Sequence, residues 1–462
     1  MLNKLFKLNV IAASMSVLIL SGCNDAETTI IEKDDIEVVE EEHDHDEHEV
    51  ESMGRLAVLS ADTSEVGIVD LDDGDLLDTF TLTHNDSTLS VSAGYRFAII
   101  ANRSNDYVGF IDGGLWREDH VEHLHDYQED PVMMDFELNG SRPTHITKHE
   151  NQTAFFFDGD ADSGTAASVQ VVTDTDISSE VTAIDTLSYD INMHGVAKPN
   201  GEHLVSTVRQ DDADSTSASK VLPDQVGLYH LHDGEYELEQ VLDIACPDLH
   251  GAAQNHEFIV FGCSDSVLVG YESDDNDEEY VAEKINNIDA LAGIRIGGLY
   301  AHEENESFIG TASAYGSSSI ILVNVLPELG KMKELGWQPA SDVTPISYAF
   351  DHEGEHFLIL DSKGFLNVLS SSEVDGEVTW ELEQSLDITD EDITNMPDNA
   401  SFSMTVAQNG HYVYVSDPIA KHVLQVNLET LEIDGDIEVD FVPKSIGWLG
   451  IAEEGDEHDH DH

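Results

Sequence analysis

The sequence predicts an all-β protein, most simply a β-propeller, and three observations lead to this fold class. From about residue 53 to 451, short segments of alternating apolar residues are broken by Gly, Asn and Asp, without a long helical period. A pair of strands recurs at a spacing of roughly 45 to 50 residues, which is typical of propeller blades. Each end of this region carries strands that lack a complete blade.

Each repeat consists of a short first strand, a polar turn and a more apolar second strand. Seven copies are visible, and they are Leu89–Val91 with Phe97–Ala101, His145–Thr147 with Ala154–Phe157, His194–Ala197 with His203–Thr207, His250–Ala253 with Phe258–Gly262, Gly298–Ala301 with Phe308–Thr311, Ile346–Phe350 with Phe357–Leu360, and Met404–Ala407 with Tyr412–Val415.

The two ends of the repeat region complement one another. Arg55–Leu82 contains later strands of a blade but no obvious first strand, whereas Val442–Trp448 is a strand without a blade. If the two segments share one blade, the ring closes and leaves no free sheet edge. We therefore expect eight blades, with seven as the alternative.

The N-terminus resembles a bacterial lipoprotein signal. Lys4 and Lys7 precede an apolar run, and Leu20-Ser21-Gly22-Cys23 has the form of a lipobox. Residues 1–22 are expected to be removed, and Cys23 to carry a lipid that tethers the chain to a membrane on the periplasmic side. No second apolar run approaches the roughly 18 residues that span a bilayer.

Two acidic, histidine-rich segments flank the repeat region. Residues 23–52 and 452–462 contain too few apolar residues to offset the entropy lost on ordering, so we expect both to be disordered. Their histidines should be weaker metal ligands that collect metal for a folded site, and these are His43, His45, His48, His458, His460 and His462.

The charge of the chain limits its partners. With 95 acidic and 19 basic residues, the formal charge of −76 excludes binding to nucleic acid or anionic membranes by charge attraction. Adaptation to a salty medium explains the excess, since it is spread over the whole chain. It also raises the local concentration of divalent cations.

Three cysteines are present, and Cys23 is expected to be lipidated. In an oxidising compartment, Cys246 and Cys263 are then predicted to form a disulfide that flanks one hairpin. A loop of this length is worth about 3 kcal/mol in the chain-entropy model.

Histidine occupies the same position in three consecutive repeats. His145, His194 and His250 each begin a predicted first strand, and first strands surround the central channel of a propeller. Three imidazoles with an open fourth position fit a tetrahedral zinc site. A histidine at any one of these positions alone would more often be a hydrogen-bonded core residue.

A second histidine cluster lies in a long polar insertion between Gly113 and Pro131. Insertions of this length inside a compact repeat are usually functional, so His120, His123 and His125 are further candidate metal ligands. A solvated loop is the alternative. The insertion follows the third strand of its blade and should leave on the face opposite the start of the first strands, which makes two separate sites as reasonable as one.

The usual signatures of catalysis are absent from the sequence. We find no Gly-rich phosphate loop, no Gly-x-Ser-x-Gly elbow and no His-Glu-x-x-His helix. The run Asp158-Gly159-Asp160-Ala161-Asp162 lacks the terminal bidentate Glu of a calcium loop and is interpreted as an acidic turn.

Several of these segments together resemble the AztD-type periplasmic zinc metallochaperones, which accompany zinc ABC importers. The resemblance runs from about Val108 to Val269 and rests on Gly109–Leu115, Arg142–His145, Phe155–Gly159, His194–Ala197, Cys246–Gly251 and Phe261–Cys263. It implies a β-propeller that binds zinc through histidines of the insertion and the channel. It also implies direct transfer to the solute-binding protein of the importer.

The sequence therefore predicts a non-enzymatic, monomeric zinc chaperone or store in the periplasm. A cell-surface interaction module with incidental histidines is the first alternative. A hydrolase with a zinc-bound water is the second, because three histidines leave one coordination position open.

Overall fold

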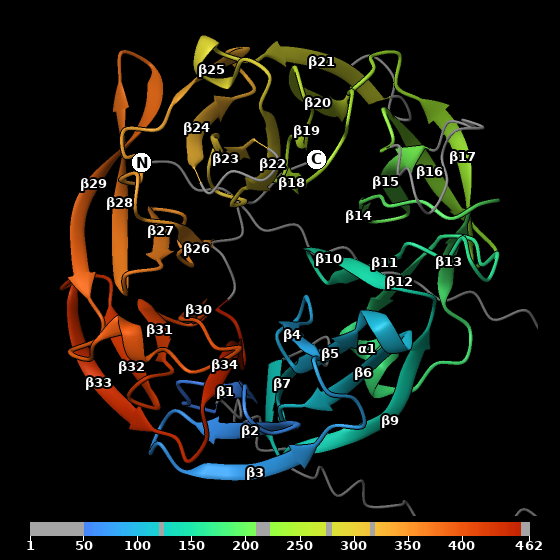
Figure 1. Ribbon diagram of the computed structural model, residues 1–462. Coiled ribbons are helices and arrows are strands. Elements are labelled where there is room, and N and C mark those ends of the chain that lie inside the picture. The colour runs from blue at the N-terminus through green and yellow to red at the C-terminus, as the bar shows by residue number, and fades with distance from the viewer. Residues whose placement is uncertain (1–49, 120–123, 209–221, 274–279, 315–318, 454–462) are drawn as a thin grey trace, which may run out of the picture. The chain divides into compact units, whose positions relative to one another are not determined.

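The computed structural model describes residues 50–119, 124–208, 222–273, 280–314 and 319–453, and within them the chain is almost entirely antiparallel β-sheet. The sheets are arranged as a ring, and the first strand of each group of four lies innermost (Figure 1). One short helix, α1 (Asp174–Ser178), and three 3₁₀ turns, η1 (Arg103–Asn105), η2 (Asp289–Leu291) and η3 (Ile393–Asn395), connect strands.

Six of the sheets in this described part have four strands each. They are β34 (Pro443–Leu449) with β1 (Arg55–Ser60), β2 (Glu65–Asp70) and β3 (Leu76–Thr81); β4 (Thr88–Val91) with β5 (Phe97–Asn102), β6 (Tyr107–Asp112) and β9 (Val132–Asn139); β18 (Ala252–Gln254) with β19 (Ile259–Gly262), β20 (Ser266–Glu272) and β21 (Tyr280–Asn286); β22 (Arg295–Tyr300) with β23 (Phe308–Ser313), β24 (Ile320–Leu326) and β25 (Lys331–Glu334); β26 (Pro345–Phe350) with β27 (His356–Asp361), β28 (Phe365–Val374) and β29 (Glu377–Asp387); and β30 (Ser403–Val406) with β31 (Tyr412–Asp417), β32 (His422–Asn427) and β33 (Glu432–Glu438).

One sheet has eight strands and consists of two groups of four joined along their outer strands. Its order is β10 (Pro143–His149), β11 (Gln152–Phe157), β12 (Ser168–Thr173), β13 (Asp185–Ser188), β17 (Glu235–Val241), β16 (Gln225–His232), β15 (His203–Val208) and β14 (Ala197–Asn200). The joint is a parallel bridge at Thr186 and Glu235, so each group keeps its own innermost strand.

The two ends of the described chain pair with each other, as the sequence predicted. Strand β34 lies next to β1 in antiparallel register, with Leu56 opposite Trp448 and Val58 opposite Ile446. The Trp448 indole also donates a hydrogen bond of 3.0 Å to the Met53 carbonyl. An all-β, propeller-like fold closed by its terminal strands is therefore confirmed.

The core lies between neighbouring sheets. Phe155, Phe156 and Phe157 are consecutive in β11 and all three are buried. Such a run departs from the alternation of a half-exposed strand, because a neighbouring sheet covers each face of β11. Burying each ring stabilises the fold by about 1.5–3 kcal/mol. Because β11 pairs with the innermost strand β10, this packing fixes the position of β10.

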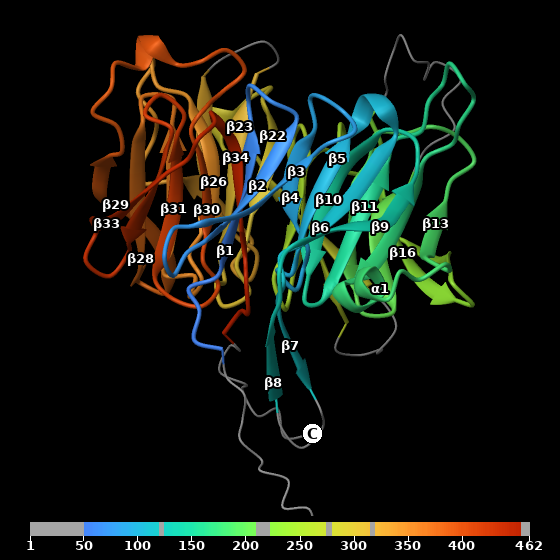
Figure 2. The ribbon, with the colours of Figure 1, turned by 90° about the horizontal axis from the view of Figure 1, so that it is seen from below.

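The polar insertion predicted as a loop is a two-stranded hairpin that projects from one face of the ring (Figure 2). It consists of β7 (Leu115–Asp119) and β8 (Leu124–Gln128). The Trp116 and Tyr127 rings stack across it with centroids 4.9 Å apart, and Arg117 Nε lies 2.6 Å from Asp126 Oδ1. These cross-strand pairs give a polar segment enough contact to form strands.

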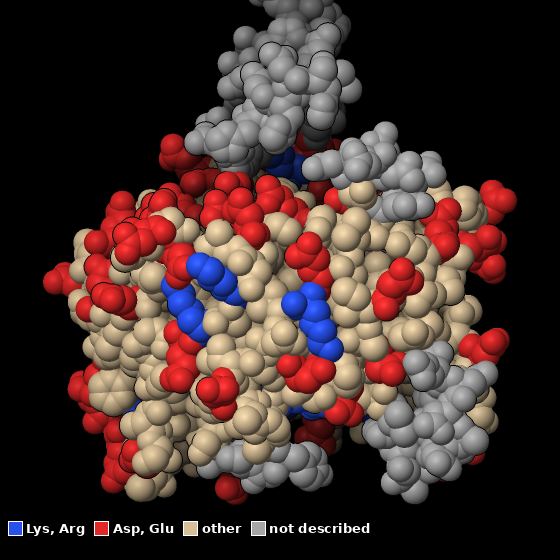
Figure 3. Space-filling model, turned by 90° about the horizontal axis from the view of Figure 1, so that it is seen from above, with Lys and Arg blue, Asp and Glu red and all other residues tan. Residues whose placement is uncertain are grey.

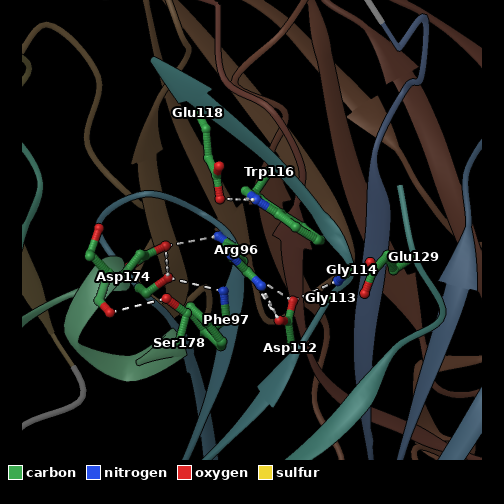
Figure 4. Close-up of polar contacts among 12 residues, drawn as sticks. Arg96, Phe97, Asp112, Gly113, Gly114, Trp116, Glu118, Glu129, Asp174 and Ser178 are labelled. Carbon is green, nitrogen blue, oxygen red and sulfur yellow. Dashed lines mark hydrogen bonds and ion pairs between the residues drawn. The ribbon is translucent and has the colours of Figure 1, made fainter. Parts of the chain in front are cut away.

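The base of this hairpin is fixed to the ring by Arg96 (Figure 4). The Arg96 guanidinium contacts both carboxylate oxygens of Asp112, the nearest at 2.6 Å, and lies 3.8 Å above the centre of the Trp116 ring. Asp112 also accepts a hydrogen bond of 2.8 Å from the Gly114 amide. One arginine thus joins the end of β6 to the start of β7.

On the side of the molecule seen in Figure 3, acidic side chains are numerous, whereas lysine and arginine are few. Within the described part, none of the helices has the length and apolar character needed to cross a membrane. The predicted signal, the lipidation site Cys23 and most of both acidic tails lie outside the described residues. The described ends of the tails, residues 50–52 and 452–453, contact the hairpin and the ring, since the Val50 amide donates to Asp126 and the Glu453 amide donates to the Gln408 carbonyl.

Candidate metal centre

Three imidazoles from neighbouring strand groups converge near the axis of the ring, and we call them the central cluster: His145, His194 and His250. One ligand atom from each ring lies within 4.8 Å of the other two, and the Nε2 atoms of His145 and His194 are 3.4 Å apart. The ring centroids are separated by 5.0, 5.3 and 5.6 Å. Ligand atoms of a tetrahedral zinc lie about 3.3 Å apart, so small movements would bring three nitrogens onto one ion.

The backbone differs from the prediction at two of the three positions. His145 lies in β10 at a register shift between Pro143 and His145, but His194 and His250 lie just before β14 and β18. A glycine follows each of these two histidines. Gly251 has φ +77°, and a Cβ there would be 2.7 Å from the Gly297 carbonyl oxygen. The backbone at Gly251 therefore packs closely against Gly297, and strand pairing in β18 begins only after His250.

Asp158 orients the ring of His194. Its Oδ2 atom lies 3.0 Å from His194 Nδ1 and 2.7 Å from Arg103 Nη2. Burial would raise the pKa of the Asp158 carboxyl, but the bond to His194 and the Arg103 charge hold that pKa below its usual value. A carboxylate on Nδ1 fixes the tautomer and leaves Nε2 facing the other two rings.

The ring of His250 is oriented by backbone. Its Nδ1 atom donates to the Gly297 carbonyl oxygen at 2.9 Å, so Nε2 is again the free nitrogen. A disulfide between Cys246 and Cys263 ties the segment before His250 to the end of β19. The His250 amide also donates to the Gly262 carbonyl at 3.0 Å. The predicted bridge thus stiffens the hairpin that follows His250.

The cluster is electrostatically suited to binding a cation through neutral rings. Burial, together with the neighbouring His194 and His250, lowers the pKa of His145 to about 4. Burial also lowers the pKa of His250. Both rings therefore stay neutral at pH 7, which is the form that coordinates metal.

Comparison with known proteins also points to a metal-binding protein. No family model matches the chain. The zinc chaperone AztD of Citrobacter koseri is 24% identical over 423 residues, which cover 88% of this chain and 89% of that protein. The structure of apo AztD from Citrobacter koseri matches with a TM-score of 0.68 at 22% identity, over 87% of this chain and 99% of that one.

The chain is AztD-like in sequence and fold. The resemblance predicted from the sequence is therefore confirmed. A second match, to the dihydro-heme d1 dehydrogenase NirN, has a TM-score of 0.54 at 11% identity, over 87% of this chain and 77% of that one, and reflects the fold alone.

In this AztD-like chain, His125 of the hairpin lies on the opposite face of the ring from the central cluster. Arg103 follows β5 and bonds to the Arg142 carbonyl at the start of β10, so β10 begins on the face where β5 ends. Strand β6 runs antiparallel to β5, and the hairpin follows its far end. His145 therefore lies toward one face of the ring, and His125, in β8, projects from the opposite face (Figure 2).

The remaining predicted ligands fall outside the described residues. These are His120 and His123 of the insertion, and His43, His45, His48, His458, His460 and His462 of the tails. Sequence reasoning missed Asp158, which belongs to the acidic run interpreted as a turn. Its position directly after the buried end of β11 was the available signal, because that position faces the start of β10.

Proposed function

We propose that this protein binds zinc at the central cluster and hands it to another protein. The observation that carries the proposal is the convergence of three imidazole nitrogens, two of them oriented by Asp158 and the Gly297 carbonyl. The similarity to a protein named as a zinc chaperone supports zinc as the metal. The scaffold we infer is an eight-bladed propeller, with the eight-stranded sheet counted as two blades.

The recipient we propose is the solute-binding protein of a zinc ABC importer, reached in the periplasm. The disulfide is consistent with an oxidising compartment. The lipid anchor at Cys23 and the collecting role of the tail histidines are parts of the same proposal. The hairpin that carries His125 would form a separate metal-handling element on the opposite face of the ring.

A zinc-dependent hydrolase has less support. Such an enzyme needs a general base beside the metal-bound water. The carboxylate in contact with the central cluster, Asp158, is already engaged by His194 and Arg103 and acts to orient a ligand.

The first test is zinc binding by the full chain and by its His145→Ala/His194→Ala/His250→Ala variant. Competition with a chromophoric chelator would measure affinity, and elemental analysis would measure stoichiometry. We expect the variant to lose the tightest zinc. The matched control, His256→Ala/His411→Ala/His422→Ala, removes three histidines from other surface positions and should retain it. Retention of the tightest zinc by the first variant would refute the central site.

The second test separates a chaperone from a store. Zinc-loaded protein would be mixed with the apo form of a zinc importer's solute-binding protein. Direct transfer predicts loss of zinc faster than its spontaneous release to a chelator. A transfer rate equal to spontaneous release would indicate a store.

A further inference from the structure

A second group of metal-type ligands lies on the outer strands of the group β14–β17, and we call it the outer cluster: His230, His232 and Glu239. His230 Nδ1 is 3.1 Å from His232 Nε2. A Glu239 carboxylate oxygen lies 3.7 Å from the first nitrogen and 3.9 Å from the second. One ligand atom from each residue thus falls within 4.8 Å of the others.

Strand geometry explains why these side chains meet. His230 and His232 are two residues apart in β16, so both rings project from the same face of the sheet. The register between β16 and β17 shifts where Leu228 pairs with Gln240 and Tyr229 pairs with Leu238. Glu239 is the extra residue of this bulge, and bulges re-aim the side chains they carry.

The surroundings add further polar groups on the same face. Strand β15 places His203 opposite His230, with ring centroids 4.9 Å apart. A Glu202 carboxylate oxygen lies 3.6 Å from His230 Nε2. Imidazoles from two strands and carboxylates from two more positions therefore gather at one place on the outer wall.

Simple ion pairing does not account for the arrangement. Other histidines of the described part meet carboxylates without a second imidazole between them, either one carboxylate, as His422 meets Asp436, or two, as His411 does. In the outer cluster, two ring nitrogens face each other across 3.1 Å, and protonating both rings would create repulsion there. Two neutral rings can share a hydrogen bond there, and a shared cation suits the same pair of neutral rings, because each nitrogen then directs its lone pair at the ion.

We propose that the outer cluster is a second site for a divalent transition metal, with zinc as the ion that its ligands suit. Two imidazoles and one carboxylate are ordinary zinc ligands, and the 3.1 Å separation is close to the distance of about 3.3 Å between ligands on a tetrahedral zinc. The side chain of His232 is 48% exposed, so the ion has direct access to solvent. This inference does not depend on the central cluster.

The test counts zinc bound by the full chain over a series of buffered free zinc concentrations. His230→Ala/His232→Ala should bind one zinc fewer per chain than the unaltered protein. The matched control, His411→Ala/His422→Ala, also removes two surface histidines and should bind the full number. Thermal unfolding followed by circular dichroism would verify that both variants remain folded. An unchanged count in the first variant would overturn the proposal.

Two further measurements locate the ion. Glu239→Gln keeps the shape of the side chain and should weaken this site by at least about tenfold. Anomalous diffraction from zinc-loaded crystals should show an ion between His230 and His232, and no anomalous peak there would count against the site. The central triple variant should keep this zinc, so failure of one site leaves the other testable.

Discussion

The central and outer clusters have similar ligands but differ in how firmly the molecule holds them. In the central cluster, Asp158 fixes His194 and the Gly297 carbonyl fixes His250. In the outer cluster, His230 and His232 contact each other and exposed surface carboxylates. Ordering a side chain costs entropy, so ligands that are already held bind more tightly. Orientation of the ligand rings, more than the identity of the ligands, should separate the two affinities.

The largest expected effect comes from removing the disulfide. Cys246→Ala/Cys263→Ala should lower the free energy of unfolding by about 3 kcal/mol, measured by denaturant titration. It should also weaken zinc binding at the central cluster, because His250 follows Cys246 by four residues. Zinc binding at the outer cluster serves as the internal control and should not change. Equal weakening at both clusters would remove the distinction drawn between them.

Next in size is the effect of Asp158. Asp158→Asn keeps the shape of the side chain but loses the charge that holds the His194 ring. We expect the zinc affinity of the central cluster to fall about 10- to 100-fold, as for other partners of ligating histidines. The exposed Asp190→Asn is the matched control. An unaltered affinity in Asp158→Asn would mean that ring orientation contributes little.

The third effect concerns the pH dependence of stability and tests the role of burial. His149 lies four residues after His145 in β10, and burial lowers its pKa to about 4. An unfolded histidine takes up a proton near 6.5. Between these values the unfolded state binds more protons, so stability falls as pH falls, by about 1.4 kcal/mol for each pH unit.

His149→Gln should therefore flatten the pH dependence of the unfolding free energy of the metal-free protein between about pH 6.5 and 4. His411→Gln, at an exposed position, should leave it as it is. Parallel curves for the unaltered protein and His149→Gln would show that this ring is not the source of the acid sensitivity.

Much of the fold followed from the sequence because its repeats are local patterns. The alternation of apolar residues gave the strand pairs, and the unmatched segments near Arg55 and Val442 predicted the closure that β1 and β34 make. The insertion was harder to interpret. Its strands depend on the stacking of Trp116 on Tyr127 and on the pairing of Arg117 with Asp126, which no short-range hydrophobic pattern reveals.

The site residues also divide into those that the repeats predict and those that depend on tertiary contacts. His145, His194 and His250 were predicted to converge because equivalent positions of successive repeats meet near the axis, and the structure places them together. Asp158 differs from the other acidic residues only by its position directly after the buried end of β11, and this signal was not used. The outer cluster was missed because Glu239 reaches the two histidines only through the bulge between β16 and β17.

Closure of the ring by β34 also has a consequence for biogenesis. The innermost strand of the first sheet is the last strand of the described chain to be synthesised, whereas its partner β1 is the first. Until β34 arrives, β1 presents an unpaired edge that can pair with other chains. The ring can thus close only after almost the whole polypeptide has been synthesised. We expect chains interrupted before Pro443 to be substrates for proteases and chaperones.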